Sequence, residues 1–130
     1  ESGLAERVFV DIDCEKFKRV VQNILDNAKK NIKEGLGRLV IMLRETRACV
    51  ILEFKDNGAG IKREDLPHIF ERFYRADSAR AIAGSSGLGL AIAKQIVEGM
   101  DGRIWAISKE GEGASILISL KKSDKKDVTV

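Results

Sequence analysis

Two glycine-bearing segments contain the residue types and spacings best suited to chemistry. The segment 56–60 (Asp-Asn-Gly-Ala-Gly) follows the apolar run 50–54 and holds one carboxylate in a tight turn. The segment 85–90 (Ser-Ser-Gly-Leu-Gly-Leu) leads directly into a helical pattern of apolar residues. Glycines let backbone N–H groups approach a ligand, and the first turn of a helix leaves N–H groups unpaired, so the second segment suits phosphate. We interpret the pair as a nucleotide site, with one segment for the base and one for the phosphates.

Three polar residues line one edge of the first predicted helix. Asn23 and Asn27 are four residues apart, so they lie one turn apart on the same face, and Lys30 falls on the same edge. Asparagine is a poor helix former, so two of them beside an apolar stripe need a reason. Amide oxygens suit Mg²⁺, and a lysine adds positive charge beside phosphates. The alternative is that both asparagines lie on a solvated edge, but the two glycine segments favour the magnesium interpretation.

Hydrophobic periodicity predicts the elements that must position these residues. We expect a helix that starts at the N-cap Asp13 and ends before Gly35, and a second helix over 88–100. Strands are expected over the ranges 7–12, 39–44, 48–55, 102–109 and 114–121. The long stretch 61–86 has no clear periodicity, which is typical of functional or mobile loops. With helices covering one face of a sheet, the expected fold class is α+β, a two-layer sandwich.

Length and composition restrict the class of protein. The 130 residues, 44% hydrophobic and 33% charged, indicate one globular domain, and no apolar run is long enough to span a bilayer. Since the chain opens with Glu1-Ser2-Gly3, we expect no signal peptide. Cys14 and Cys49 are far apart and form no CxxC motif, so we expect reduced thiols in a cytoplasmic protein.

The charge distribution argues against a nucleic-acid partner. Most of the net charge of +3 comes from the segment 121–130, which holds four Lys and two Asp. The remainder of the chain is nearly neutral, whereas duplex binding usually needs a basic stripe. We expect residues 1–121 to form the domain and residues 122–130 to form a basic, disordered tail.

Together these motifs give the chain a clear family resemblance. It resembles the catalytic and ATP-binding domain of sensor histidine kinases, in the ATPase superfamily shared with type II topoisomerases, heat-shock chaperones and mismatch-repair ATPases. The resemblance covers nearly the whole chain, in order and at normal spacings. It rests on the N box (22–30), the first glycine box (56–60), the F box (69–75), the second glycine box (87–90) and the closing residues 102–105 and 111–113.

The resemblance implies a fold, two cofactors and a set of site residues. The fold would be a Bergerat-type two-layer α/β sandwich, with a mixed sheet of about five strands and an ATP lid over 71–86. ATP and Mg²⁺ would be the cofactors, with Asn27 as the metal ligand. Asn23 and Lys30 would lie beside the triphosphate and Arg75 would reach it from the lid, which makes these three the expected catalytic residues. The other expected nucleotide contacts are Asp56, Gly58, Gly60, Ile61, Phe70, Tyr74, Ser86, Gly87, Leu88, Gly89 and Leu90.

Asp56 is expected to recognise adenine. A carboxylate accepts a hydrogen bond from the N6 amine of adenine, whereas guanine presents a carbonyl there. Since an unpaired buried polar group is costly, such a site can discriminate by about 10⁴-fold. Gly58 and Gly60 would let the backbone turn beneath the base. The alternative is that Asp56 only forms a turn, because Asp-Asn-Gly is a good turn sequence.

Asn23 and the single histidine bear on the reaction. Hydrolysing members of the superfamily carry a glutamate at the position of Asn23, and an amide cannot replace it as a base. We therefore expect transfer of the γ-phosphoryl group to a protein rather than to water. The only histidine, His68, follows Pro67 and lies outside the H-E-x-R/K-x-P setting of an acceptor, so we expect it to be a structural or surface residue.

The missing acceptor defines the expected partners. These are a dimerisation and histidine-phosphotransfer domain of the same kinase, absent from this chain, and a response regulator downstream. The domain by itself would be monomeric. We expect it to be the cytoplasmic portion of a membrane-bound bacterial sensor kinase.

Three details concern the boxes themselves. Asn31 replaces the aromatic residue usual after the N-box lysine, and Ser85 occupies the usual first glycine of the second glycine box, with Gly84 displaced by one. Phe70 and Phe73 are both expected to pack as apolar anchors at the base of the lid.

Two other functions are compatible with the motifs. An anti-sigma-type serine kinase has the same fold, but such kinases usually carry Glu where this chain has Asn23. A non-catalytic nucleotide-binding module would signal through the order of its lid. The intact glycine boxes and Arg75 favour catalysis.

Overall fold

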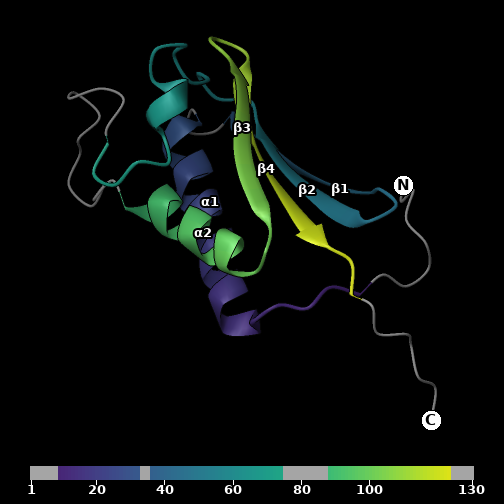
Figure 1. Cartoon of the computed structure of the whole chain (residues 1–130). Coiled ribbons are helices and arrows are strands. Elements are labelled where there is room, and N and C mark those ends of the chain that lie inside the picture. Colours follow the sequence, from purple (N-terminus) through teal and green to yellow (C-terminus); the bar gives the residue numbers. More distant parts are fainter. Residues whose placement is uncertain (1–8, 33–35, 75–87, 124–130) are drawn as a thin grey trace.

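The computed structural model describes residues 9–32, 36–74 and 88–123. Two long helices lie on one face of a sheet, and Figure 1 shows them as a layer beside the strands. This arrangement confirms the predicted α+β sandwich, and both predicted helices and the four predicted strands from 39 onward match observed elements closely. In chain order the elements are α1 (Cys14–Asn31), β1 (Leu39–Glu45), β2 (Cys49–Asp56), the 3-10 helix η1 (Leu66–His68), α2 (Gly89–Gly99), β3 (Arg103–Lys109) and β4 (Gly113–Lys121).

The strands follow the order β1-β2-β4-β3, and every neighbouring pair is antiparallel. The resemblance implied a mixed sheet of about five strands, so the sheet formed by the described residues is smaller and of one type. Among the described residues of the predicted strand 7–12, Val10 forms a single antiparallel bridge to Lys122, and none of the others belongs to a strand.

β4 ends at Lys121, and the first two residues of the predicted tail still contact the domain. The Lys122 N–H donates to the Ala48 carbonyl (2.9 Å), and its Nζ pairs with Glu45 (2.8 Å). The Ser123 N–H donates to the Phe9 carbonyl at 2.6 Å. Residues 122 and 123 are therefore hydrogen-bonded to the body of the domain, and residues 124–130 lie outside the described part of the chain.

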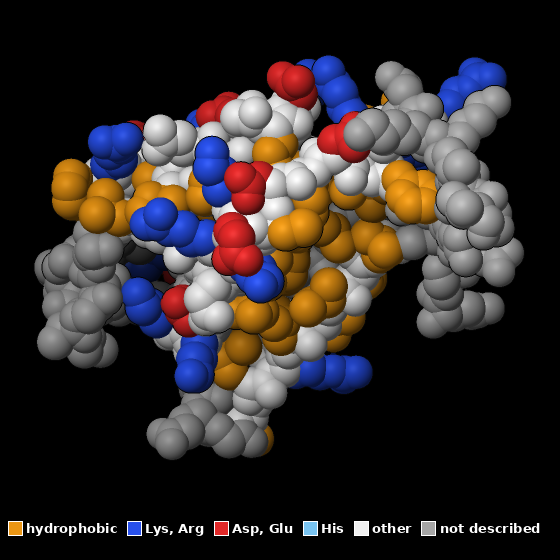
Figure 2. Space-filling view, turned by 90° about the horizontal axis from the view of Figure 1, so that it is seen from below, with side chains coloured by type: hydrophobic (Ala, Val, Ile, Leu, Met, Phe, Trp, Pro, Cys, Tyr) orange, Lys and Arg blue, Asp and Glu red, His pale blue; other side chains and the backbone are white. Residues whose placement is uncertain are grey.

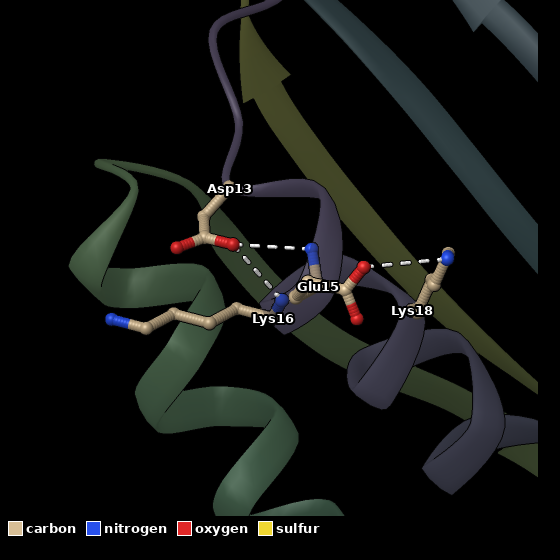
Figure 3. Close-up of polar contacts among 4 residues, drawn as sticks. All are labelled: Asp13, Glu15, Lys16 and Lys18. Carbon is tan, nitrogen blue, oxygen red and sulfur yellow. Dashed lines mark hydrogen bonds and ion pairs between the residues drawn. The ribbon is translucent and has the colours of Figure 1, made fainter.

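The start of α1 is fixed by the predicted N-cap, Asp13. Its Oδ1 accepts hydrogen bonds from the N–H groups of Glu15 (3.1 Å) and Lys16 (3.2 Å), as Figure 3 shows. An exposed ion pair between Lys18 and Glu15 (3.4 Å) follows on the first turns. A side-chain cap of this kind contributes about 1 kcal/mol by satisfying N–H groups that have no intrahelical partner. The cap therefore sets the register of the polar edge that carries the asparagines.

The core lies between the helices and the helix-facing side of the sheet. Its buried side chains come from both helices and the two central strands: Val20, Ile24, Leu90, Ala93, Val97, Phe54, Ile116, Ile118 and Leu120. These residues repeat every three or four positions in the helices and every second position in the strands, as the sequence predicted. The core thus holds α1 against α2 and both against β2 and β4.

The edge strand β1 keeps apolar side chains exposed. Ile41 and Leu43 pair with Phe54 and Leu52, so they lie on the helix-facing side, yet both are exposed because β1 is at the edge of the sheet. Figure 2 views the molecule from below and shows hydrophobic side chains gathered on that side of the molecule, with charged side chains beside them.

The stretch between β2 and α2 is only partly described. Residues 61–74 contain turns and the short helix η1, in agreement with the predicted lack of periodicity, and residues 75–87 lie outside the described ranges. Ile69 and Phe70 pack against the core, so this stretch is attached to the body of the domain. Among the residues described, neither helix has the length and apolar character needed to cross a membrane.

Candidate functional site

The side chain of Asn23 lies against the first residue of α2. A Cβ atom added at Gly89 would be 3.8 Å from the Asn23 Cβ, so the two backbones approach closely there. The Nδ2 atom of Asn23 is buried and has no hydrogen-bond partner among the described residues. An unmet buried donor costs free energy, about 1–3 kcal/mol, unless an acceptor reaches it. The polar edge of α1 and the start of α2 therefore lie in contact at Asn23 and Gly89.

The other two residues of the polar edge follow along α1. Asn27 is half-buried one turn after Asn23, and Lys30 is exposed in the last turn of the helix. The partial burial of Asn27 places it between the core stripe and solvent, which excludes a fully solvated position. No group of three His, Cys, Asp or Glu side chains that could hold a metal ion exists among the described residues. A metal ion at this place would therefore be coordinated by amide oxygens of the protein and by the molecule bound there.

Asp56 is a buried carboxylate at the end of β2, with 5% of its surface exposed. Its Oδ1 accepts hydrogen bonds from the N–H groups of Gly58 (2.9 Å) and Ala114 (3.2 Å). Oδ1 therefore stabilises the turn, as the turn-forming alternative predicts. Oδ2 accepts no hydrogen bond from the described residues. Phe54 belongs to the core and lies two positions earlier, so Asp56 points toward the same helix layer.

The glycines around Asp56 are required by close backbone packing. Gly60 has φ of +77°, and an added Cβ would lie 2.5 Å from the Lys109 carbonyl oxygen. Gly113 has φ of +100°, and its added Cβ would overlap the carbonyl oxygen of Asp56. A residue with a side chain would be both strained and in collision at these two positions. The first glycine box therefore packs directly against the hairpin that β3 and β4 form.

Two more bonds hold this turn on the hairpin. The hydroxyl of Ser108 accepts a hydrogen bond from the Ile61 N–H (2.6 Å) and donates to the Gly113 carbonyl (3.2 Å). The Gly111 N–H donates to the Ala59 carbonyl at 2.7 Å. The backbone from 59 to 61 is thus fixed by the hairpin of β3 and β4, although the two segments are far apart in sequence.

Asn57 ties the same turn to the segment that follows α1. Its Oδ1 accepts from the Arg38 N–H (2.8 Å), and its Nδ2 donates to the Leu36 carbonyl (3.1 Å). Its own N–H donates to the Arg38 carbonyl at 3.2 Å. The turn is therefore held from both sides, by the hairpin and by the approach to β1.

Phe70 and Tyr74, both expected to contact nucleotide, have different surroundings. Phe70 packs against the core, and the Lys94 ammonium lies 6.0 Å from its ring centre. The Tyr74 hydroxyl donates a hydrogen bond to Oδ1 of Asp65, and the Tyr74 ring stacks on His68 at 5.1 Å. The bond to Asp65 is the largest of the effects that raise the pKa of Tyr74 to about 12.

The structure corrects the prediction for Phe73 and confirms that for His68. Phe73 was expected to pack as an anchor, but 69% of its surface is exposed. Its φ of +62° is left-handed, and this bend keeps the ring away from the core to which Phe70 is attached. His68 is partly exposed and its Nδ1 lies 2.7 Å from the Glu71 carboxylate, a surface contact as expected.

Several predicted residues cannot be placed. Arg75, Ser86 and Gly87 lie outside the described residues. Of the remaining members of the second glycine box, Leu88 directly precedes α2, Gly89 begins it and Leu90 is buried in the core. The described residues thus bring together Asn23 and Gly89, and separately the turn 56–61 and the hairpin.

Sequence reasoning gave no role to Asp65, Asn57 or Ser108. Asp65 precedes Leu-Pro, which is a typical N-cap position, but its carboxylate bonds to Tyr74 instead of capping η1. Asn57 was seen only as part of a turn, and nothing in the sequence indicated that Ser108 faces Ile61. Each of these three side chains forms a hydrogen bond with a residue that is distant in the sequence, which no local pattern indicates.

Comparison with known proteins agrees with this geometry. Residues 12–124 match the family model described as histidine kinase-, DNA gyrase B-, and HSP90-like ATPase. The chain therefore belongs to this ATPase family. The match begins before α1 and ends after β4, so it includes the polar helix edge and the turn at Asp56.

The relatives found are sensor kinases. The chain is 43% identical over 119 residues to the sensor protein kinase WalK of Staphylococcus haemolyticus, which covers 89% of this chain and 19% of that protein. It is 40% identical over 123 residues to the sensor histidine kinase WalK of Bacillus subtilis, covering 92% and 20%. The chain thus spans about a fifth of the length of these relatives.

Solved structures show the same fold. A mycobacterial sensor histidine kinase, MprB, superposes with a TM-score of 0.78 at 36% identity, over 87% of this chain and 76% of that one. The catalytic domain of the histidine kinase ThkA gives a TM-score of 0.73 at 25% identity, over 87% and 70%. Within the ATPase family, the chain therefore groups with histidine kinase catalytic domains.

Proposed function

We propose that this chain is the ATP-binding catalytic domain of a two-component sensor histidine kinase. It transfers the γ-phosphoryl group of ATP to a histidine on a separate dimerisation domain, and a response regulator acts downstream. The observation that carries the proposal is the buried, unpaired amide of Asn23 against Gly89 at the start of α2. Family membership and the sensor kinase relatives support ATP as the ligand.

The residues present fit a magnesium-bound triphosphate. The Asn23 Nδ2 is a donor without an acceptor, and phosphate oxygens are acceptors. The first turn of α2 adds backbone N–H groups and the positive end of the helix dipole. Asn27 would hold Mg²⁺ through its amide oxygen, and Lys30 and Arg75 would add positive charge. When bound, the metal neutralises charge on the phosphates.

The turn at Asp56 fits adenine. Oδ1 is fixed by the N–H groups of Gly58 and Ala114, so the orientation of the carboxylate is set before any ligand arrives. Oδ2 is then available to accept the N6 amine, which guanine lacks. Gly58, Gly60 and Ile61 would form the surface beneath the base.

Asn23 also favours transfer over hydrolysis. An amide cannot take a proton from water, so the domain has no base at the position where hydrolysing relatives use glutamate. Its own residues bind and orient the nucleotide, and the nucleophile comes from the acceptor histidine. Positioning and charge stabilisation are sufficient for this type of transfer.

Two measurements test the proposal. Calorimetric titration with ATP and GTP, with and without Mg²⁺, should show magnesium-dependent binding of ATP and very weak binding of GTP. Labelled ATP should then phosphorylate a separate helical domain that carries an acceptor histidine in the H-E-x-R/K-x-P setting, with little free phosphate released.

Three other results would redirect the assignment. Equal affinity for both nucleotides would exclude the role of Asp56. Binding of ATP without transfer would indicate a non-catalytic module, and transfer to serine would indicate an anti-sigma-type kinase. The cytoplasmic portion of a membrane-bound sensor remains the proposed setting.

A further inference from the structure

Ser108 is a half-buried residue of β3 to which the proposed function gives no role. Its Oγ accepts a hydrogen bond from the Ile61 N–H at 2.6 Å. Its own proton is donated to the Gly113 carbonyl (3.2 Å), which lies nearer than the Ile61 carbonyl (3.5 Å). One hydroxyl therefore joins the segment that follows β2 to the first residue of β4.

The peptide group after Gly113 continues this connection to Asp56. The Gly113 carbonyl and the Ala114 N–H belong to one peptide group, which is planar and rigid. Ser108 donates to the carbonyl of this group, and the N–H of the same group donates to Asp56 Oδ1 at 3.2 Å. A continuous series of hydrogen bonds thus runs from the Ile61 N–H, through the Ser108 hydroxyl and this peptide group, to the Asp56 carboxylate.

The packing around Gly113 makes the orientation of this peptide group important. An added Cβ at Gly113 would overlap the Asp56 carbonyl oxygen, so the two backbones are in direct contact. A rotation of the peptide group would move its N–H away from the Asp56 carboxylate. The Ser108 hydroxyl opposes such a rotation, and its hydrogen bond to the carbonyl polarises the group so that the N–H becomes a stronger donor.

The two ends of the series are assigned to the same ligand. The proposed function gives the adenine amine to Asp56 and places Ile61 beneath the base. One residue contacts the edge of the ring and the other its face, so their relative position must match a single base. Ser108 is hydrogen-bonded to one of them directly and to the other through one peptide group.

We propose that Ser108 is a positioning residue for adenine recognition, which holds the Asp56 carboxylate and the Ile61 backbone in the relative position that one base requires. The role rests on the proposed function, because it needs adenine at Asp56. The hydroxyl donates its proton within the protein, so Ser108 orients the residues that contact the base without contacting it. Its loss should therefore reduce the preference for adenine.

Two nucleotides that differ only in the base measure this preference. Inosine triphosphate (ITP) has a carbonyl where ATP has the N6 amine, and its ribose and triphosphate are the same. The ratio of the two dissociation constants, measured by calorimetry with Mg²⁺, therefore reports the contact with the base. Ser108→Ala should lower the preference for ATP by about 10-fold, the effect of one net hydrogen bond.

Two other variants at this position separate the hydrogen bonds from the volume of the side chain. Ser108→Thr keeps the hydroxyl and should keep the preference for ATP. Ser108→Cys has nearly the volume of serine but forms only weak hydrogen bonds, so it should lower the preference as alanine does. The cysteine variant also provides the test if the alanine variant does not fold.

Ser115→Ala is the matched control on the same hairpin. Ser115 is buried in β4, and its hydroxyl donates to Glu53 Oε2 at 2.8 Å. Because side chains alternate along a strand, this bond lies on the opposite face of the sheet from Asp56. Ser115→Ala should lower the midpoint of urea denaturation about as much as Ser108→Ala does, without changing the preference for ATP. A merely structural role for Ser108 would make the two variants behave alike.

Hydrogen exchange of the Ile61 amide tests the contact in the absence of nucleotide. The bond to Ser108 should slow exchange of this N–H in the native chain. Ser108→Ala should accelerate it by about 10-fold or more, and by more than Ser115→Ala does. Equal exchange rates in the native chain and Ser108→Ala would contradict the first bond of the series.

The outcomes keep the two proposals apart. If the native chain prefers ATP to ITP and the variants without the hydroxyl keep the full preference, the positioning role is wrong and the proposed function stands. An equal loss of preference in Ser108→Ala and Ser115→Ala also overturns the role, because it would reflect stability alone. If the native chain binds both nucleotides equally, the base contact of the proposed function fails and the positioning role fails with it.

Discussion

The turn at Asp56 and the contact between Asn23 and Gly89 are built in opposite ways. In the turn, the backbone groups of Gly58, Ile61 and Ala114 are all paired, and the glycines are fixed by packing against the hairpin. At the helix contact, the Asn23 donor has no partner within the described ranges. The turn is thus held by hydrogen bonds within the protein, whereas the buried donor at the helix contact lacks an acceptor there.

This difference indicates what each region contributes to binding. A turn held in place by such hydrogen bonds can recognise a base by shape and by one available oxygen, and it needs no rearrangement when the ligand arrives. An unpaired buried donor gains its hydrogen bond only when the ligand supplies an acceptor, so its cost is recovered on binding. Substitutions in the turn should therefore affect stability, and substitutions at the helix contact should affect affinity.

Gly113→Ala should give the largest effect. The added methyl group would overlap the Asp56 carbonyl oxygen at a φ of +100°, so we expect the free energy of unfolding to fall by about 3 kcal/mol or more. Urea denaturation measures this loss. Gly111→Ala is the matched control, since its φ is +83° but nothing lies within 4 Å of the added atom. It should cost only about 1 kcal/mol, from backbone strain alone. Equal losses would show that the turn is not packed on the hairpin as described.

Asn27→Ala should reduce affinity without reducing stability. Asn27 is only half-buried and alanine is the better helix former, so the melting temperature should hardly change. We expect magnesium-dependent ATP affinity to fall about 10-fold, as calorimetry with and without Mg²⁺ would show. A collapse of the melting temperature would mean that the amide is a structural group.

Gly89→Ala tests the helix contact with a smaller change. The added methyl would be in ordinary contact with Asn23 at 3.8 Å, and alanine favours the helix, so stability should stay equal or rise by about 0.5–1 kcal/mol. ATP affinity should fall, because the methyl group would restrict the approach of phosphate to the Asn23 amide. An unchanged affinity in calorimetry would remove the second glycine box from the site.

The smallest expected effect is the pH dependence of the Asp65–Tyr74 bond. The folded pKa of Tyr74, about 12, lies above the ordinary value of 10.0, so the native state holds this proton more tightly than the unfolded state. The stabilisation is fully present below pH 10 and is lost as the pH rises through 12. Urea midpoints of the native chain should therefore fall more steeply above pH 10 than those of Tyr74→Phe. Parallel curves would contradict the bond.

The sequence predicted the two layers and both halves of the site because these depend on local patterns. The spacing of Val20, Ile24 and Ala28 indicated the buried face of α1, and the N-cap Asp13 fixed its start. Glycine followed by an apolar helix pattern located the start of α2. Such signals are contained in a few consecutive residues, so one sequence is enough to find them.

The remaining features depend on partners that are distant in the chain. The partner of Asp65 is Tyr74, and the support of the turn comes from Ser108, which no local pattern links to Ile61. The exposure of Phe73 results from one left-handed residue that the sequence does not indicate. The strand predicted over 7–12 pairs at Val10 alone among the described residues, because alternation does not reveal where the partner strand ends.

The central claim is that Asn23, the start of α2 and the turn at Asp56 bind one molecule of ATP. The most direct test is a titration of the chain with ATP and Mg²⁺ followed by NMR, observing the Asn23 side-chain amide and the backbone amides of Gly58 and Gly89. The account predicts that all three signals shift and saturate at the same nucleotide concentration. Shifts confined to one region, or different midpoints for the two regions, would contradict it.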